Sequence, residues 1–331
     1  MPSIDPTLII SGDESVALSL HRRNLEVFHV ATGETELIEL PNPGKLIAVD
    51  RDAFALIGYA RGSPVTIRTY RQPQQIIASA EVRGYTLTAT EGGEHFDRLP
   101  PLLLVGVDSA LLRRDGTFRM RRLRSALPDW VTDAEALSYA ATCPDGRHVL
   151  ICGYKYDGEL LLWDGGSGRV DTQMKLLTHG VMAGCFRPGR AELWIGQIDT
   201  LERIDTREWR IMAAKRLRNE PTGSFVEAFA FDTDGHRLAV AHALRRPQSL
   251  PGTEWPWYAP SGGQLLILDA DRFLVTHTLW VDRWLDALAW LSDGRIVARE
   301  WGSDGAFRIL SPEPGDHALH QPRKPGDWNW I

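Results

Sequence analysis

The sequence predicts an all-β protein made of repeated four-stranded units. Short apolar runs alternate with turns rich in Gly, Pro and Asp along the chain. No helical hydrophobic period of comparable length competes with this pattern. The same strand, turn and strand also return at a nearly constant separation. Both observations indicate antiparallel hairpins arranged in a repeat.

The clearest unit covers residues 138–168, SYAATCPDGRHVLICGYKYDGELLLWDGGSG. Its first strand ends at the turn Pro144-Asp145-Gly146. Two further apolar strands, 148–153 and 159–163, flank a second turn that contains an Asp-Gly pair. Such a unit cannot bury both of its faces alone, so the rest of the chain is expected to supply more copies.

The turn after the first strand gives a register mark, by which we mean the residue that aligns with Gly146. The marks that follow are Arg190, Gly235 and Gly294, with separations of 44, 45 and 59 residues. A period of about 40–45 residues with four short strands is typical of a β-propeller. The longest interval predicts extra residues, which we assign to a Pro- and Gly-rich loop insertion at about 245–263.

Fainter copies precede the clearest unit. Runs that begin at Ser15 (SVALSL), Ala53 (AFALIG) and Pro101 (PLLLVG) are interpreted as second strands. Seven units then cover the chain. We therefore predict one domain, residues 1–331, folded as a seven-bladed β-propeller of four-stranded antiparallel blades. The sequence leaves open which end of the chain closes the ring.

Residues 138–168 resemble one blade of the WD-repeat family, because the third strand ends in Trp163-Asp164. The family places an Asp in the turn before this strand, six residues ahead of the Trp, and Asp157 occupies that position. Asp304 stands at the same distance from Leu310. The resemblance implies a propeller, and the family has no shared catalytic residues, so it implies no reaction.

Composition limits the classes of function. The 331 residues carry a formal net charge of −6, which leaves no basic surplus to neutralise phosphates, so a nucleic-acid partner is not expected. Cys143, Cys152 and Cys185 form an odd set without a CxxC pair and are expected to be reduced thiols. With no signal-peptide pattern and no membrane-length apolar run, we expect a cytoplasmic protein that contacts no membrane.

Motifs of the common enzyme classes are missing from the sequence. It contains no HExxH, GxSxG, P-loop or paired CxxC, and its 10 histidines are scattered. Asp232-Thr233-Asp234-Gly235 lacks the later acidic ligands of a calcium loop. We therefore predict no catalytic residues, no cofactor and no metal. A propeller enzyme that assembles its site from several blades stays possible.

Aromatic and arginine residues gather in loops that are expected to open at one end of the blades. These are the loops between second and third strands and the links between blades. Such a composition is typical of interface hot spots. The predicted partner-binding residues are Trp130, Tyr154, Tyr156, Arg245, Arg246, Trp255, Trp257, Tyr258, Arg283, Trp284 and Trp301.

We therefore predict a non-catalytic scaffold that binds one or more proteins, as part of a complex, through this aromatic loop face. An alternative is that Trp280 and Trp284 only pack on a neighbouring blade. The second functional hypothesis is an enzyme or small-ligand receptor with its site at the channel mouth beneath residues 245–263. The basic run Arg113–Arg124 is expected to form the solvated outer edge of blade three, with an acidic partner or phosphate as the alternative.

Overall fold

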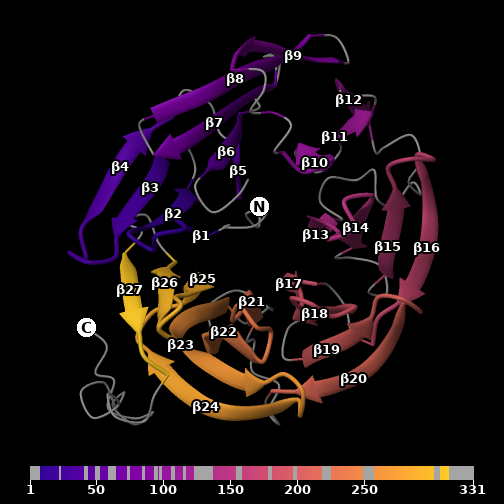
Figure 1. The fold of residues 1–331 in the computed structure, drawn as a ribbon. Coiled ribbons are helices and arrows are strands. Elements are labelled where there is room, and N and C mark those ends of the chain that lie inside the picture. The colour runs from indigo at the N-terminus through magenta and orange to yellow at the C-terminus, as the bar shows by residue number, and fades with distance from the viewer. Residues whose placement is uncertain are drawn as a thin grey trace. The chain divides into compact units, whose positions relative to one another are not determined.

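A computed structural model shows that the chain is a seven-bladed β-propeller, as predicted (Figure 1). The described residues form 27 strands and no helix. No described segment is a helix long and apolar enough to cross a membrane. The structure describes residues 8–21, 24–40, 44–48, 53–58, 65–72, 75–83, 86–92, 96, 99–105, 109–114, 117–122, 137–153, 159–177, 181–196, 200–217, 225–248, 257–301 and 306–312.

Blade one takes all four of its strands from the start of the chain. Its strands are β1 (Ile9–Ile10), β2 (Val16–His21), β3 (Asn24–His29) and β4 (Thr35–Glu39), paired in that order. The first repeat unit of the sequence therefore forms a complete blade. In the described part of the chain, the N-terminal strand belongs to the first blade and to no other sheet.

Blades two and three share one eight-stranded sheet. The strands are β5 (Gly44–Ala48), β6 (Phe54–Gly58), β7 (Thr66–Gln72), β8 (Gln75–Arg83), β9 (Thr86–Glu91), β10 (Leu102–Val105), β11 (Ser109–Arg114) and β12 (Thr117–Arg122). Strand β9 continues the hairpin from β8 and meets β12 through the single residue pair Thr86 and Arg119. This one pair joins the two blades into a continuous sheet.

Two predictions for blade three are wrong. The run from Pro101 forms β10, which is the first strand of its blade, and β11 is the second strand. The apolar run LLLV was mistaken for a second strand because no Asp-Gly turn marks the register there. The basic run 113–124 includes the β11–β12 hairpin, yet β9 lies beyond β12, so this hairpin is not the outer edge of its sheet. Arg114, Arg119 and Arg121 are nevertheless exposed.

The remaining blades follow the predicted repeat. Blades four to seven consist of β13 (Leu137–Thr142), β14 (His148–Gly153), β15 (Glu159–Asp164), β16 (Arg169–Lys175), β17 (Ala183–Phe186), β18 (Glu192–Gly196), β19 (Thr200–Asp205), β20 (Arg210–Arg216), β21 (Phe225–Phe231), β22 (Arg237–Gln248), β23 (Trp257–Asp269), β24 (Leu274–Val281), β25 (Leu285–Trp290), β26 (Ile296–Glu300) and β27 (Phe307–Leu310). Blade seven has three strands among the described residues.

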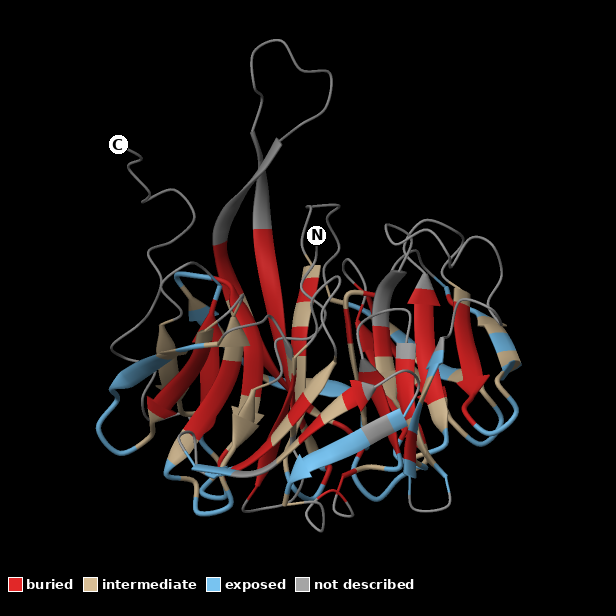
Figure 2. Cartoon of the chain, turned by 90° about the horizontal axis from the view of Figure 1, so that it is seen from above, coloured by how far each residue is buried: buried red, intermediate tan, exposed pale blue. Residues whose placement is uncertain are grey.

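The chain divides into two compact units, which we describe separately. The first contains Met1–Val181 and Asp205–Ile211, and the second contains Met182–Ile204 and Met212–Ile331. In both units, buried residues occupy the middle of the strands and exposed residues the turns (Figure 2). This distribution follows from the apolar strand centres and the Gly, Pro and Asp turns of the sequence.

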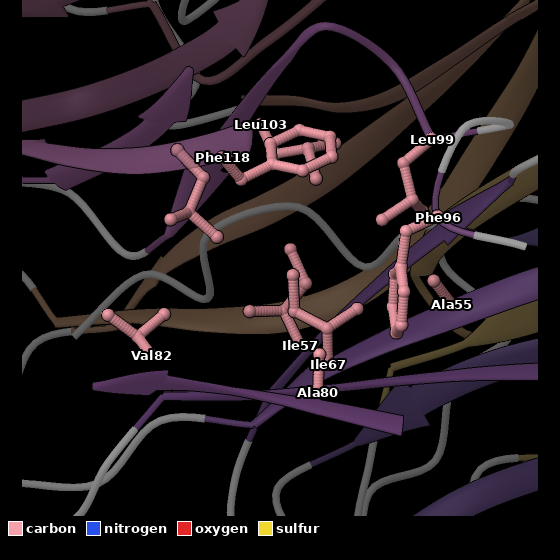
Figure 3. Close-up of a cluster of buried hydrophobic side chains, with 10 residues drawn as sticks. Ala55, Ile57, Ile67, Ala80, Val82, Phe96, Leu99, Leu103 and Phe118 are labelled. Carbon is pink, nitrogen blue, oxygen red and sulfur yellow. The ribbon is translucent and has the colours of Figure 1, made fainter. Parts of the chain in front are cut away.

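Apolar side chains fill the space between neighbouring blades. In the first unit, Ile57 and Ile67 of blade two face Leu103 and Phe118 of blade three (Figure 3). In the second unit, one cluster joins blades five and six around Trp194, and another joins blades six and seven. Each fully buried large apolar side chain contributes about 1.5–3 kcal/mol, so inter-blade packing is a principal source of stability.

The register marks of the sequence coincide with real turns. Each marked residue donates its backbone N–H to the carbonyl three residues earlier, at 3.0 Å for Gly146, 3.3 Å for Arg190, and 3.0 Å for both Gly235 and Gly294. Asp carboxylates accept backbone N–H groups in three of these turns. For example, Asp145 accepts from Arg147 and His148. The predicted repeat is thus confirmed from residue 143 onward.

The turn between the third and fourth strands also repeats. Asp164, Asp205 and Asp269 end the third strand, and each carboxylate accepts backbone N–H groups of the turn that follows. The fourth residue after each Asp has a positive φ, which is 71° at Gly168, 48° at Trp209 and 55° at Phe273. The Asp of the Trp-Asp pair therefore stabilises a hairpin turn.

Candidate interaction surface

A two-stranded ribbon extends from blade six. Strands β22 and β23 stay paired from Arg237 and Asp269 as far as Gln248 and Trp257. The flanking strands β21 and β24 pair with them only as far as Ala243 and Gly263. Among the described residues, segments 245–248 and 257–260 therefore pair only with each other. We call these two segments the ribbon.

The predicted irregular loop at 245–263 is thus largely strand, and only 249–256 lie outside the described residues. Sequence analysis missed these strands because Pro247 and Pro260 interrupt the alternating pattern. Proline is tolerated where a strand has a free edge, since its missing N–H is not needed for a ladder bond. The ribbon has such edges in the described part of the chain.

The root of the ribbon is fixed by close backbone packing. The register shifts between Ala243 and Arg245, and the Leu244 carbonyl accepts the Trp284 indole N–H at 3.1 Å. On the other strand, Gly262 has a φ of 91°, and a Cβ there would lie 2.8 Å from the Val281 carbonyl oxygen. Only glycine fits this conformation and spacing without strain. The ribbon therefore leaves the blade from a defined position.

Trp284 and Trp301 form a pair beside this root. Their ring centroids lie 5.5 Å apart at an interplanar angle of 50°, and the Trp301 backbone N–H donates to the Trp284 carbonyl at 2.8 Å. Trp284 is 6% exposed, whereas Trp301 is 56% exposed. Trp284 thus packs within the blades, and it supports the indole that Trp301 presents to solvent.

Charged residues flank the tryptophan pair. The buried Glu300 carboxylate forms ion pairs with Arg308 and, at 3.7 Å, with Arg283. A second ion pair joins the buried side chains of Arg299 and Asp286. Arg283 is 53% exposed at its side chain, so its guanidinium can also meet a partner. Trp301, Trp284 and Arg283 together form what we call the Trp301 surface.

The structure brings only part of the predicted site together. Arg283, Trp284 and Trp301 are neighbours, and the ribbon starts directly after Leu244, whose carbonyl Trp284 contacts. The ribbon carries the backbone positions of Arg245, Arg246, Trp257 and Tyr258. Trp130, Tyr154, Tyr156 and Trp255 lie outside the described residues, as do the WD-type positions Asp157 and Asp304.

A hollow of about 380 Å³ lies at the opposite end of blade six. It is lined by His236, Arg237, Ile267, Asp269, Asp271, Thr276, His277 and Pro312. Several of its charges are paired, since His236 contacts Asp271 at 3.2 Å and Arg237 contacts Asp232 at 3.0 Å. The hollow is therefore a mixed and largely neutralised surface. Within the described residues, no group of three or more His, Cys, Asp or Glu side chains could hold a metal ion.

Sequence reasoning missed a buried arginine that joins blades five and six. Arg187 donates to the Gly235 carbonyl at 2.7 Å, to Glu192 at 3.1 Å and to Asp271 at 2.6 Å. The bond from Arg187 lowers the pKa of Asp271. Sequence analysis identified the turn at Arg187 only through its register mark, Arg190. A charged residue that interrupts an apolar strand end was the available signal for an inter-blade ion pair.

No protein-family model matches this chain, and a search of curated proteins finds none with significant similarity. The fold assignment therefore rests on the strand order, the sheet registers and the inter-blade cores described above.

Proposed function

We propose that the protein is a non-catalytic scaffold that binds a partner protein through the Trp301 surface and the ribbon. The observation that carries the proposal is a half-exposed indole, Trp301, which is held rigidly by a buried one, Trp284. A tryptophan whose orientation is fixed before binding loses little conformational entropy on association. Rigid Trp and Arg side chains are also the residue types that dominate binding energy at protein interfaces.

The ribbon gives independent support for the same proposal. A two-stranded hairpin is marginally stable by itself in water. Here two strands continue for several residues beyond the sheet to which they belong, and they start beside Trp284. Contact with a partner would cover their free edges. Such a strand edge can also accept a strand from the partner.

The Trp-Asp ending of blade four fits membership of the WD-repeat family, which we include in the proposal. Many propellers of this kind serve as platforms in protein complexes, so the assignment agrees with a scaffold. Cys143 is a buried free thiol, and burial raises its pKa to about 12. Unreactive free thiols fit a reducing compartment, and we propose that the protein acts in the cytoplasm.

The test is a pull-down from extract of the cells that express the protein. Wild type is compared with Trp301→Ala and with a variant in which Gln248–Ala259 is replaced by a short Gly-Ser link. Leu37→Ala is the matched control, because Leu37 is 62% exposed on the outer strand of blade one. A protein retained by wild type and Leu37→Ala is then purified, and its affinity for all four forms is measured.

Loss of about thirtyfold or more in affinity with Trp301→Ala would fit a hot-spot residue, which contributes about 2 kcal/mol or more. Equal affinity for wild type, Trp301→Ala and the linker variant would contradict the proposal. Failure of every bait to retain a protein would also contradict it, and ligand screening would then be directed at small molecules.

A further inference from the structure

The outer strand of blade six differs from the other long outer strands in its charge. Strand β24 has the sequence LVTHTLWV, and its residues alternate between exposed and half-buried. The exposed positions are Leu274, Thr276, Thr278 and Trp280, and none carries a charge. Leu274 is 50% exposed and Trp280 is 39% exposed. In the described part of the chain, β24 is the last strand of its sheet, so its outer edge has no neighbouring strand.

Uncharged edge strands are unusual, because charges on an edge discourage pairing between copies of a protein. The outer strands of blades four and five follow that rule. If β16 paired antiparallel with itself about its centre, Arg169 would oppose Lys175. If β20 did the same, Arg210 would oppose Arg216. Like charges directly opposite each other destabilise a strand pair.

Self-pairing of β24 has the opposite character. In an antiparallel pair centred on His277, exposed residues oppose exposed residues, with Leu274 against Trp280 and Thr276 against Thr278. Pairs of aromatic with aliphatic residues and of threonine with threonine both stabilise neighbouring strands. A shift of one residue would place exposed positions against half-buried ones, so the burial pattern favours this register.

Charges just beyond the two ends of β24 fit the same register. Antiparallel alignment brings the Arg272 end of one strand beside the Asp282 end of the other copy. Both residues are exposed. A twofold axis repeats this pair, so the arrangement gives two contacts between opposite charges. The strand and its flanks are therefore self-complementary in polarity and charge.

We propose that β24 is a dimerisation edge, which pairs antiparallel with β24 of a second copy of this chain in the register centred on His277. The two blades then form one continuous eight-stranded sheet across the twofold axis. This surface is separate from the Trp301 surface, so the dimer can present two such surfaces to partners. The inference does not depend on the proposed function.

The test measures the dimer dissociation constant of the full chain by analytical ultracentrifugation. Thr278→Lys places a charge in the middle of the strand. Asp282→Arg turns both Arg272 contacts into like-charge contacts, and the double variant Arg272→Asp/Asp282→Arg restores opposite charges. Asp234→Arg is the matched control, since Asp234 is an exposed turn carboxylate of the same blade. Circular dichroism and the melting temperature check that each variant is folded.

We expect a wild-type dimer with a dissociation constant in the micromolar range. Thr278→Lys and Asp282→Arg should each weaken it on the order of tenfold, while Asp234→Arg leaves it unchanged. The double variant should recover most of the loss from Asp282→Arg. A wild-type protein that is monomeric up to high micromolar concentration would overturn the proposal. A dimer that tolerates Thr278→Lys, or whose charge reversal is not rescued, would overturn it equally.

Discussion

The two ends of the blades are built in different ways. One end carries the turns between strands one and two and between strands three and four, and we call it the turn end. There, backbone bonds, Asp carboxylates and positive φ values repeat from blade to blade. The other end carries the connections between strands two and three and the links between blades, and we call it the link end. It holds the ribbon and the Trp301 surface.

This difference shows where the repeat is constrained. A turn-end residue satisfies a backbone group only a few positions away, so the same residue types recur at the same spacing. At the link end, the chain only has to reach the next strand, and its length and composition can serve binding. We therefore expect the loss of hydrogen-bonded or buried groups at the turn end to change stability, and exposed substitutions at the link end to change binding alone.

The largest effect on stability is expected at Arg187. The substitution Arg187→Ala removes a buried guanidinium. It leaves the Gly235 carbonyl without this donor, and it removes one hydrogen bond from each of the Glu192 and Asp271 carboxylates. Removing one partner of a buried ion pair typically costs about 3–5 kcal/mol. Urea unfolding followed by tryptophan fluorescence should show a loss of that size.

Arg190→Ala is the control for this measurement, because Arg190 is exposed in the same turn. Its free energy of unfolding should stay within about 0.5 kcal/mol of wild type. Similar losses of unfolding free energy for Arg187→Ala and Arg190→Ala would mean that the hydrogen bonds of Arg187 between blades five and six contribute little to stability.

Trp284 and Trp301 allow the comparison to be tested within the link end. Trp284→Phe removes the N–H that the Leu244 carbonyl accepts, and it leaves a partly filled space around a buried ring. A buried acceptor without its donor costs about 1–3 kcal/mol, so we expect a loss of about 2 kcal/mol in thermal or urea unfolding.

Trp301→Ala should change the free energy of unfolding by less than about 1 kcal/mol, since more than half of that side chain is exposed. Equal losses for the two substitutions would show that Trp301 is structural. In that case Trp284 and Trp301 would not differ as a structural residue and a solvent-presented residue.

The regularity of the turn end explains which parts of the fold could be predicted from sequence. The marks at Gly146, Arg190, Gly235 and Gly294 correspond to turns because each turn needs a particular backbone conformation or an Asp acceptor nearby. The first strand of blade three was misassigned because Pro101 precedes an apolar run without such a turn. Turn residues such as Gly and Asp identify turns from the sequence, whereas an apolar run alone does not show which strand of a blade it forms.

The candidate site was less predictable for a related reason. The composition of the link end pointed to Trp284 and Trp301, yet only the packing separates the buried from the exposed one. The ribbon was missed because a free-edged strand can contain Pro247 and Pro260, which the alternating pattern treats as breaks. Arg187 was missed because its partners lie 48 and 84 residues away in sequence.

Glycine substitutions measure how tightly neighbouring turns are packed at the turn end. Gly235 and Gly168 have nearly equal φ values of 70° and 71°. A Cβ at Gly235 would lie 2.9 Å from the Pro188 carbonyl oxygen, whereas a Cβ at Gly168 would have no atom within 4 Å. Gly168→Ala should therefore cost about 1 kcal/mol, for the left-handed conformation alone.

Gly235→Ala should cost more, up to about 2 kcal/mol, because the backbone of blade five must also move. Chemical unfolding of the two variants gives the difference directly. If Gly168→Ala lowered the free energy of unfolding more than Gly235→Ala, close contact between the turns of blades five and six would not explain why position 235 is a glycine.

The smallest expected effect concerns the acid stability of the Trp-Asp turn. Arg147 donates to Asp164 at 2.9 and 2.7 Å, and this pair holds the pKa of Asp164 well below its usual range. Because the native carboxylate resists protonation, its stabilising contribution is complete above the unfolded-state pKa of about 3.9 and is lost as the pH falls below it. Asp164→Asn removes this proton linkage.

The wild-type free energy of unfolding should therefore fall more steeply than that of Asp164→Asn below about pH 4, by at most about 1.4 kcal/mol per pH unit. Asp171→Asn is the control, since Asp171 is 60% exposed at its side chain on the neighbouring strand. Because Arg147 is 62% exposed, solvent screens the pair, and at pH 7 Asp164→Asn should cost only about 1 kcal/mol. Parallel pH profiles for wild type and Asp164→Asn would show that Asp164 supports its turn through the bonds to the Gly166 and Ser167 N–H groups, which an asparagine oxygen can also accept.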